Sequence, residues 1–197
     1  TIGSKAFASC CYALTSVTIP DSVTTIGEGA FGGCDALKAF YGKFASTDNR
    51  CLIVDGVLNS FAPAGLTEYT IPNSVMAIGD SAFRYCSALT SVTIPDSVTM
   101  ILISAFRDCD ALTSVTIGNG VTTIGSYAFY NCDALKEVYC EPTTPPTANR
   151  IGSNWSAFNG NASGRKIYVP TASVDAYKAA TNWIEYADAI EPYTFTE

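Results

Sequence analysis

The carboxylates are the side chains of this sequence best suited to chemistry. Asp108 and Asp110 flank Cys109. Two more aspartates hold the position of Asp110 in neighbouring segments, namely Asp35 and Asp133. A row of carboxylate oxygens could hold Ca²⁺. Ser87 interrupts this row, and an aspartate after a helical turn commonly bonds to nearby backbone, so we expect no metal site.

Acid–base and nucleophilic catalysis find little support in the residue types. The sequence contains no histidine, which removes Ser-His and Cys-His catalysis and imidazole metal ligation. Hydrolysis by paired carboxylates needs a cleft and an environment that separates two pKa values. The flank of a repeating coil is expected to offer neither. We therefore predict a protein that is not an enzyme and has no catalytic residue and no cofactor.

The cysteines recur at a fixed position. Of the eight, five follow a phenylalanine by three residues: Cys10, Cys34, Cys86, Cys109 and Cys132. Side chains that share a position in successive coils point the same way, so we predict a row of buried, unbridged thiols that act as small hydrophobes. One or more disulfides is the alternative. A metal site is disfavoured because no Cys-x-x-Cys pair is present.

These positions belong to a repeat of 23 residues. Its regular copies are Leu14–Ala36, Leu66–Ala88, Leu89–Ala111 and Leu112–Ala134. A fixed period in this range, with Leu, Val and Ile in fixed places, is typical of a leucine-rich solenoid. The Val-x-Ile pair alternates as in a strand, and the Ala-Phe-x-x-Cys segment suits one short helical turn.

The repeat predicts an α/β leucine-rich repeat solenoid that is right-handed and β-rich, with a parallel sheet on one face. We expect one continuous sheet formed by Val17 and Ile19, Phe40, Tyr69 and Ile71, Val92 and Ile94, Val115 and Ile117, and Val138. A glycine recurs directly after the Val-x-x-Ile segment, where the coil is expected to turn a corner: Gly27, Gly79 and Gly125. Leu102 replaces it in one copy, which implies strain at a positive φ, an exposed apolar spot together with Ile103, or simple local repacking.

One unit, residues 37–65, departs from the period. Asp55-Gly56 separates two apolar runs, 51–54 and 57–58, and this pattern indicates a β-hairpin with a type I′ turn. We expect the hairpin to replace the return half of a coil. It is either a packed variant of the repeat or a protrusion that binds a partner.

The repeat also sets the expected domain organisation. We expect a solenoid over 1–140, with units 1–13 (partial), 14–36, 37–65, 66–88, 89–111, 112–134 and 135–140 (the start of the last coil). Residues 141–197 lose the period and are expected to form a C-terminal cap. An open solenoid must cover its last apolar layer. We expect the aromatic side chains of the cap to do so: Trp155, Phe158, Tyr168, Tyr177 and Trp183.

The residues between the apolar strand positions should face solvent in rows, one row for each position of the repeat. They form a candidate ligand face that is rich in hydroxyls and nearly uncharged: Tyr41, Thr67, Glu68, Thr70, Thr90, Ser91, Thr93, Thr113, Ser114, Thr116 and Tyr139. The alternative is that threonine is simply a favourable exposed strand residue.

Charge narrows the class of partner. There are 11 basic and 18 acidic residues, for a net charge of −7, which argues against nucleic acid and anionic membrane surfaces. No run of 18 apolar residues occurs, so no transmembrane helix is expected. We expect a monomer that binds a protein or a glycan. The chain begins inside a repeat at Thr1, so we expect a piece of a longer protein whose export signal is not visible.

The unit Leu-x-x-Val-x-Ile-Pro-x-x-Val-x-x-Ile-Gly-x-x-Ala-Phe-x-x-Cys resembles the BspA-like, or Treponema pallidum type, leucine-rich repeat family. The hairpin unit and the segment Tyr168–Ala179 look like features of surface proteins from Bacteroides-like bacteria. The resemblance implies a secreted or cell-surface protein that mediates adhesion or binds host matrix proteins. It supplies no site residues. A spacer that presents another domain and a carbohydrate-binding module are the alternatives.

Overall fold

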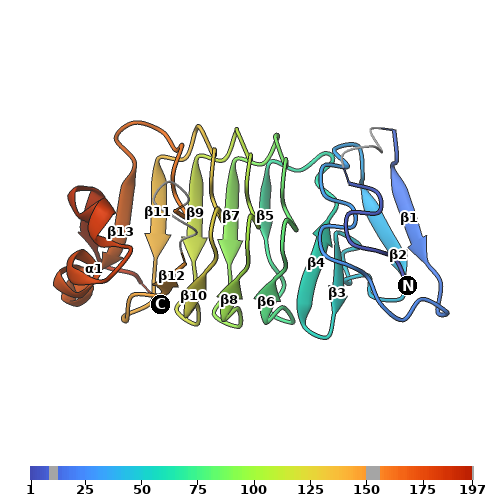
Figure 1. The fold of residues 1–197 in the computed structure, drawn as a ribbon, viewed down its shortest axis with the longest axis horizontal. Helices are drawn as coiled ribbons and strands as arrows, with labels where there is room; N and C mark the ends of the chain where they lie inside the picture. The colour runs from blue at the N-terminus through green and yellow to red at the C-terminus, as the bar shows by residue number, and fades with distance from the viewer. Residues whose placement is uncertain (9–12, 150–155, 197) are drawn as a thin grey trace.

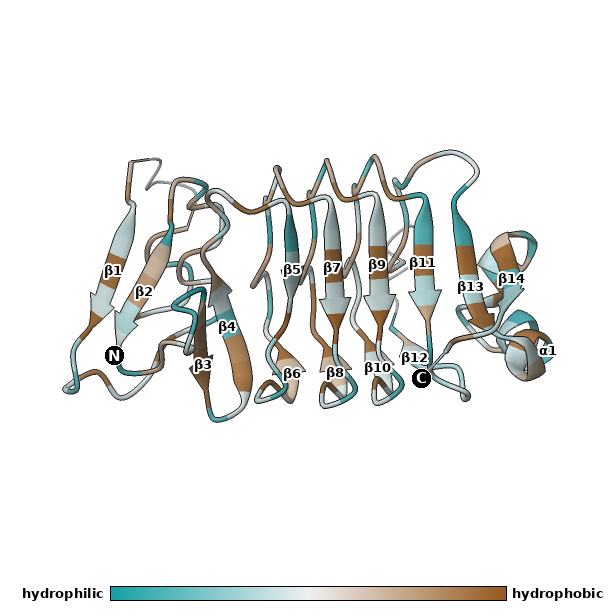
Figure 2. Cartoon of the chain, turned by 180° about the vertical axis from the view of Figure 1, so that it is seen from behind, coloured by the Kyte–Doolittle hydropathy of each residue, from teal (hydrophilic) through white to brown (hydrophobic). Residues whose placement is uncertain are grey.

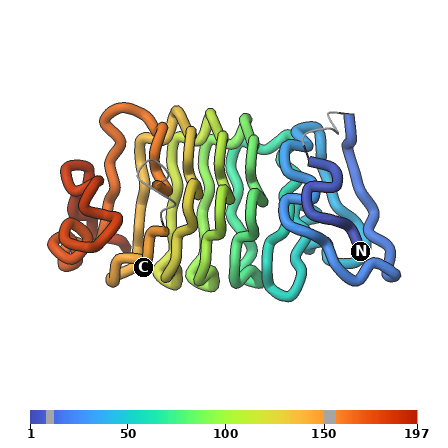
Figure 3. Tube along the Cα trace, viewed as in Figure 1, coloured from blue at the N-terminus to red at the C-terminus, as the bar shows by residue number. Residues whose placement is uncertain are grey.

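The computed structural model describes residues 1–8, 13–149 and 156–196. They form an elongated solenoid in which each repeat makes one coil, stacked along the long axis (Figures 1 and 3). The predicted leucine-rich repeat fold is confirmed. Helical structure in these residues is short: a 3₁₀ helix η1 (Thr171–Ser173), the α-helix α1 (Val174–Ala179) and a second 3₁₀ helix η2 (Ile184–Ala189).

The coils that begin at residues 66, 89, 112 and 135 each contribute a strand to each of two sheets, which are parallel except for one antiparallel pair in the second. The first sheet has the order β14-β13-β11-β9-β7-β5, and the second has the order β12-β10-β8-β6-β4-β3. The strands of the first are β5 (Glu68–Thr70), β7 (Ser91–Ile94), β9 (Ser114–Ile117), β11 (Glu137–Cys140), β13 (Lys166–Pro170) and β14 (Ile190–Tyr193). Those of the second are β3 (Cys51–Val54), β4 (Val57–Phe61), β6 (Ala77–Ile78), β8 (Met100–Ile101), β10 (Thr123–Ile124) and β12 (Thr147–Ala148). The sequence predicted the first sheet and, from the second, only the hairpin formed by β3 and β4.

The expectation of one continuous sheet over all the coils is wrong at the divergent unit. Strands β1 (Ser16–Ile19) and β2 (Ala39–Gly42) pair only with each other. The extra residues of the unit lie beside β2, because the Phe40 N–H donates to the Asn49 carbonyl at 2.7 Å. The Tyr69 hydroxyl donates to Asp48 at 2.9 Å and so joins this segment to β5. The inserted backbone therefore takes the place that β5 would have occupied.

The predicted hairpin is present and is packed into the solenoid. β3 and β4 are antiparallel, and the turn residues Asp55 and Gly56 have φ values of 49° and 78°, as a type I′ turn requires. β4 also pairs in parallel with β6, and Leu58 is fully buried. The packed alternative is therefore the one that the structure adopts.

The core is a stack of identical side chains. Phe83, Phe106, Phe129 and Phe158 follow one another with ring centroids 4.7, 5.0 and 5.2 Å apart. Bands of apolar residues recur at the same height on successive strands (Figure 2). The divergent unit divides the core, because the buried residues between Ile19 and Phe40, with Leu52 and Ala62, form a cluster separate from the remainder.

The cysteine row lies beside the phenylalanine stack. Cys34, Cys86, Cys109 and Cys132 are buried and carry no disulfide, whereas Cys10 lies outside the described residues. The Cys109 thiol donates to the Phe83 carbonyl at 3.1 Å and thus links two coils. Burial raises the pKa of Cys109 well above its ordinary value. The row is therefore a set of structural hydrogen-bond donors.

The thiols of this row should react slowly in the folded protein. Burial raises the pKa of Cys109 and shields all the thiols of the row from the reagent, and the thiolate is the reactive form, so labelling requires local opening. We expect Cys86, Cys109 and Cys132 to react with iodoacetamide at pH 8 on the order of 100-fold more slowly than in denaturant. Peptide-resolved mass spectrometry measures each site separately. Equal rates in folded and denatured protein would contradict this prediction.

The corner glycines are needed for space and not for a positive φ. A Cβ on Gly125 would lie 2.7 Å from the Leu102 carbonyl carbon, and one on Gly79 would lie 2.8 Å from the Leu58 oxygen. Positive φ values occur two residues later, as at Ser104 and Tyr127. Leu102 therefore carries no such backbone strain. Ile103 is 44% exposed, which matches the alternative of an exposed apolar spot.

The C-terminal residues continue the first sheet and close the end of the core. β13 pairs with β11, and α1 and η2 lie beyond it (Figure 1). Tyr177 and Trp183 are fully buried. Their polar atoms donate to the loop that leaves the last coil, Tyr177 to Pro142 at 2.8 Å and Trp183 to Pro146 at 2.7 Å. Trp155 lies outside the described residues.

Candidate functional site

The register of the first sheet aligns the predicted ligand face. Val92, Val115 and Val138 are paired neighbours that point into the core. The residues on either side of them point outward and form two rows. One row is Glu68, Ser91, Ser114, Glu137 and Lys166, and the other is Thr70, Thr93, Thr116, Tyr139 and Tyr168. The structure therefore places most of the predicted residues on one surface.

Tyr41 is not on this surface. It lies on β2 opposite Thr18, in the separate two-stranded sheet, where its side chain is 46% exposed. The sequence placed it at the position of Tyr139 in the repeat. The inserted segment of the divergent unit separates the two.

The threonines of this surface differ in whether their hydroxyls already form hydrogen bonds within the protein. The Thr90 hydroxyl donates to the Thr67 carbonyl at 2.9 Å, and the Thr113 hydroxyl donates to the Thr90 carbonyl at 3.0 Å. These hydroxyl protons are therefore already used between coils. Thr70, Thr93 and Thr116, by contrast, make no side-chain hydrogen bond to any residue that the structure describes. Their hydroxyls can bond to a ligand.

An aromatic cluster stands at the C-terminal end of this row. Tyr139 and Tyr168 stack with centroids 4.9 Å apart, and Tyr193 contacts both, at 5.2 and 5.6 Å. Phe195 extends the cluster at 4.8 Å from Tyr193. Sequence reasoning assigned Tyr168 to the cap and missed Tyr193 and Phe195, since neither has a place in the repeat.

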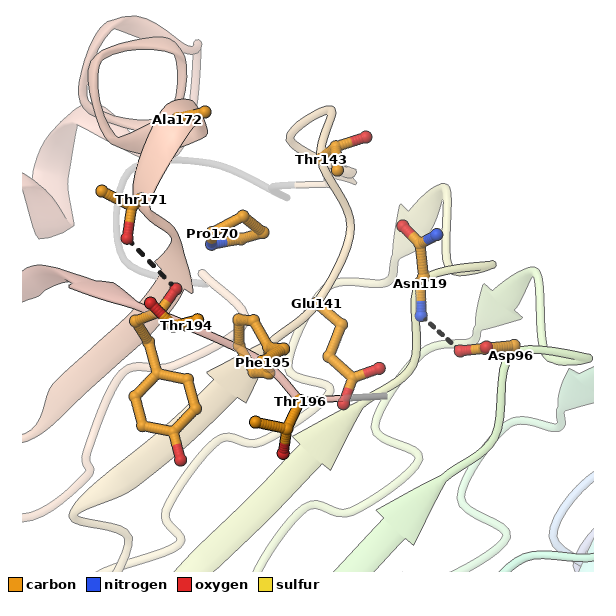
Figure 4. A pocket seen from close by; sticks show the side chains of 11 residues that line it. Asp96, Asn119, Glu141, Thr143, Pro170, Thr171, Ala172, Thr194, Phe195 and Thr196 are labelled. Carbon is orange, nitrogen blue, oxygen red and sulfur yellow. Dashed lines mark hydrogen bonds between the residues drawn. The ribbon is translucent and has the colours of Figure 1, made fainter.

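A groove of about 560 Å³ lies beside the aromatic cluster (Figure 4). One side is formed by the turns that follow β7, β9 and β11, and these carry Asp96, Asn119 and Glu141. The other side is formed by the start of η1, which follows β13, and by residues 193–196 at and after the end of β14. A second hollow of about 510 Å³ shares Asp96 and Glu141 and reaches Thr93 and Thr116. The two hollows together extend the candidate face past the ends of the strands.

The turns are held in place by a hydrogen bond across coils. The Asn119 N–H donates to Asp96 at 2.7 Å (Figure 4). A Cβ at Gly118 would lie 2.7 Å from that same carboxylate oxygen, so glycine is required there. Burial, and then repulsion from Asp96, raises the pKa of Glu141. In the described part of the chain, neither carboxylate forms an ion pair.

The carboxylates of the turns and those of the flank have different surroundings. Asp96 and Glu141 share the groove at the strand ends, which is a place other than the flank considered from the sequence. On the solenoid flank, Asp108 is instead engaged by Arg84 at 3.4 Å and Arg107 at 3.2 Å. Within the described residues no group of three or more potential ligands is placed to hold a metal ion.

The fold and this face define a leucine-rich solenoid with an extended surface. Comparison with known families gives a match over residues 1–48 and 58–180 to the BspA type leucine rich repeat region, in six copies. The chain belongs to this family. No curated protein sequence matches it. Among the residues described, no helix is long and apolar enough to cross a membrane.

Solved structures agree with this assignment. A leucine rich cell surface protein from Faecalibacterium prausnitzii is 27% identical, with a TM-score of 0.56 over 81% of this chain and 50% of its own. A leucine-rich repeat protein from Eubacterium ventriosum is 26% identical, with a TM-score of 0.59 over 81% and 43%. The pneumococcal vaccine antigen PcpA, at 17% identity and a TM-score of 0.61 over 96% and 57%, shares the fold. The chain thus spans about half the length of the first two relatives.

Proposed function

We propose that this chain is a non-enzymatic binding module of a bacterial surface protein, and that it contacts a partner protein through the first sheet. The row of available hydroxyls on Thr70, Thr93 and Thr116 carries the proposal. The parallel ladder fixes the spacing of these groups, and solenoids commonly bind through such extended surfaces. Membership of a repeat family with cell-surface relatives supports the location.

The charge and the aromatic content of the row determine how the proposed contact should behave. The row is uncharged from Thr70 to Tyr168, so electrostatic steering is weak and binding should depend little on salt. Tyr139 is expected to contribute most among the predicted residues, since tyrosine combines a large contact area with a polar tip. Adhesion would then rely on many coils or many copies. Host matrix proteins are the first partners to test.

Three lysines introduced into the available row should weaken the contact. The variant Thr70→Lys/Thr93→Lys/Thr116→Lys places charged chains across the centre of the face and is expected to weaken binding at least about tenfold. Surface plasmon resonance against immobilised fibronectin, fibrinogen, laminin and collagen measures this change in affinity.

The matched control carries the same charge on the other sheet. Thr99→Lys/Thr122→Lys/Thr147→Lys changes three exposed threonines on or beside β8, β10 and β12 and should bind as the parent chain does. Unchanged binding by a folded Thr70/Thr93/Thr116 variant would move the contact elsewhere. If the parent chain binds none of these proteins, the result would favour the alternative that the chain is a spacer which presents another domain.

A further inference from the structure

We propose that the groove between the strand-end turns and the C-terminal segment binds an uncharged oligosaccharide. This site adjoins the threonine row and shares Thr93 and Thr116 with it, but the inference does not rest on the protein contact proposed above. Three properties of the groove carry the inference: its shape, its aromatic wall and its polar lining.

The shape suits a chain-like ligand. The two hollows, of about 560 and 510 Å³, adjoin through Asp96 and Glu141. One continues to Phe195 and the other to Thr93 on the sheet. A linear oligosaccharide of several rings can lie along such an elongated depression, whereas a compact ligand would leave one hollow unused.

The aromatic wall suits a sugar ring. Tyr193 and Phe195 line the groove and meet edge to face, at an interplanar angle of 61°. The C–H groups on one side of a pyranose ring form an apolar patch with slight positive character, which complements the negative face of an aromatic ring. Tyr193 packs against Tyr139 and Tyr168, so little side-chain freedom is left to lose on binding.

The polar lining suits sugar hydroxyls. Asp96 and Glu141 supply carboxylate oxygens that accept hydrogen bonds, and neither forms an ion pair with a described residue. Thr143 and Thr196 add hydroxyls along the same groove, and the Thr171 hydroxyl, which donates to the Tyr193 carbonyl at 3.4 Å, can still accept a hydrogen bond. A few convergent polar groups beside an aromatic wall are the usual composition of a small-ligand site.

The charge of the groove selects among glycans. No lysine or arginine is found among the residues that line the two hollows, while Asp96 and Glu141 are both acidic. A uronic or sialic acid would meet only like charge there and would be repelled. A basic peptide is the competing occupant, and the basic probe described below tests it.

The test is a titration of the whole chain with defined probes. Isothermal titration calorimetry and ¹⁵N-resolved NMR would use cellohexaose, mannohexaose, xylohexaose and lacto-N-neotetraose as neutral sugars. Hexagalacturonate serves as the anionic probe and hexalysine as the basic one. We expect at least one neutral sugar to bind and to shift the amide signals of Asn119 and Phe195, and no binding of hexagalacturonate.

Variants test the assignment of the wall. Phe195→Ala is expected to weaken binding of the neutral sugar at least about tenfold. Glu141→Gln is expected to weaken this binding less, because glutamine keeps the shape of the glutamate side chain. Tyr41→Ala, an exposed tyrosine on the separate sheet, is the matched control and should bind as the parent chain does. The NMR shifts of the parent chain give a readout that needs no variant.

Several results would overturn the proposal. The first is that no neutral probe binds at millimolar concentration, and the second is that the NMR shifts are confined to residues outside the groove. The third is that Phe195→Ala binds as tightly as the parent chain, and the fourth is that only hexalysine binds. Phe195 does not lie in the Thr70/Thr93/Thr116 row, so failure here leaves the protein-contact test unaffected.

Discussion

A chain that ends at Ala134 is expected to aggregate or to unfold at a melting temperature lower by on the order of 10 °C or more. This truncation removes β11, β13 and the helices, and uncovers the Phe129 layer that stacks on Phe158 at 5.2 Å. Each large apolar side chain returned to water costs about 1.5–3 kcal/mol, and several are uncovered at once. An uncovered sheet edge adds a site for association.

Differential scanning calorimetry and size-exclusion chromatography measure the effect of this truncation. The matched control removes only residues 194–197, whose described members are exposed or half-buried, and should melt as the parent does. A soluble Ala134 truncation with the melting temperature of the full chain would show that the C-terminal residues are not a cap.

Cys109→Lys is expected to lower the free energy of unfolding by on the order of 3–5 kcal/mol, because it buries an ammonium without a partner. Cys109 is fully buried at the centre of the thiol row. Cys109→Ser keeps a donor for the Phe83 carbonyl and should cost only about 1–2 kcal/mol. The adjacent Asp110→Lys places the same charge at an exposed position and is the matched control.

Urea titration followed by circular dichroism gives the ranking of these variants. We expect Cys109→Lys to be far less stable than Cys109→Ser, with Asp110→Lys close to the parent chain. Comparable stability of Cys109→Lys and Asp110→Lys would mean that the thiol row does not support the core.

The fold could be predicted from the sequence because one set of spacings repeats. Val92, Val115 and Val138 hold the same place in three units, and strand pairing simply stacks them. The division of the first sheet could not be predicted in this way. It depends on where the inserted backbone near Asn49 makes its hydrogen bonds, and one irregular unit contains no second copy for comparison.

The two candidate sites also differ in how far they could be predicted from the sequence. The threonine row follows from the period, and so do Asp96 and Asn119, which hold the same place in two repeats. The residues on the other side of the groove, such as Tyr193 and Phe195, have no place in the repeat. Glu141 and Phe195 are 54 residues apart and meet only because β13 and β14 bring the end of the chain back beside the turns. Long-range packing of this kind has no local pattern in the sequence.

The division of the core at the divergent unit has a consequence for cooperativity. Stability in a solenoid passes from each coil to its neighbour, so a weak junction separates two folding units. The cluster that contains Phe31 and Phe40 is much smaller than the one that contains Phe83 and Phe106. Under a pulling force the smaller unit should open first, while the coils that bear the threonine row and the groove stay folded.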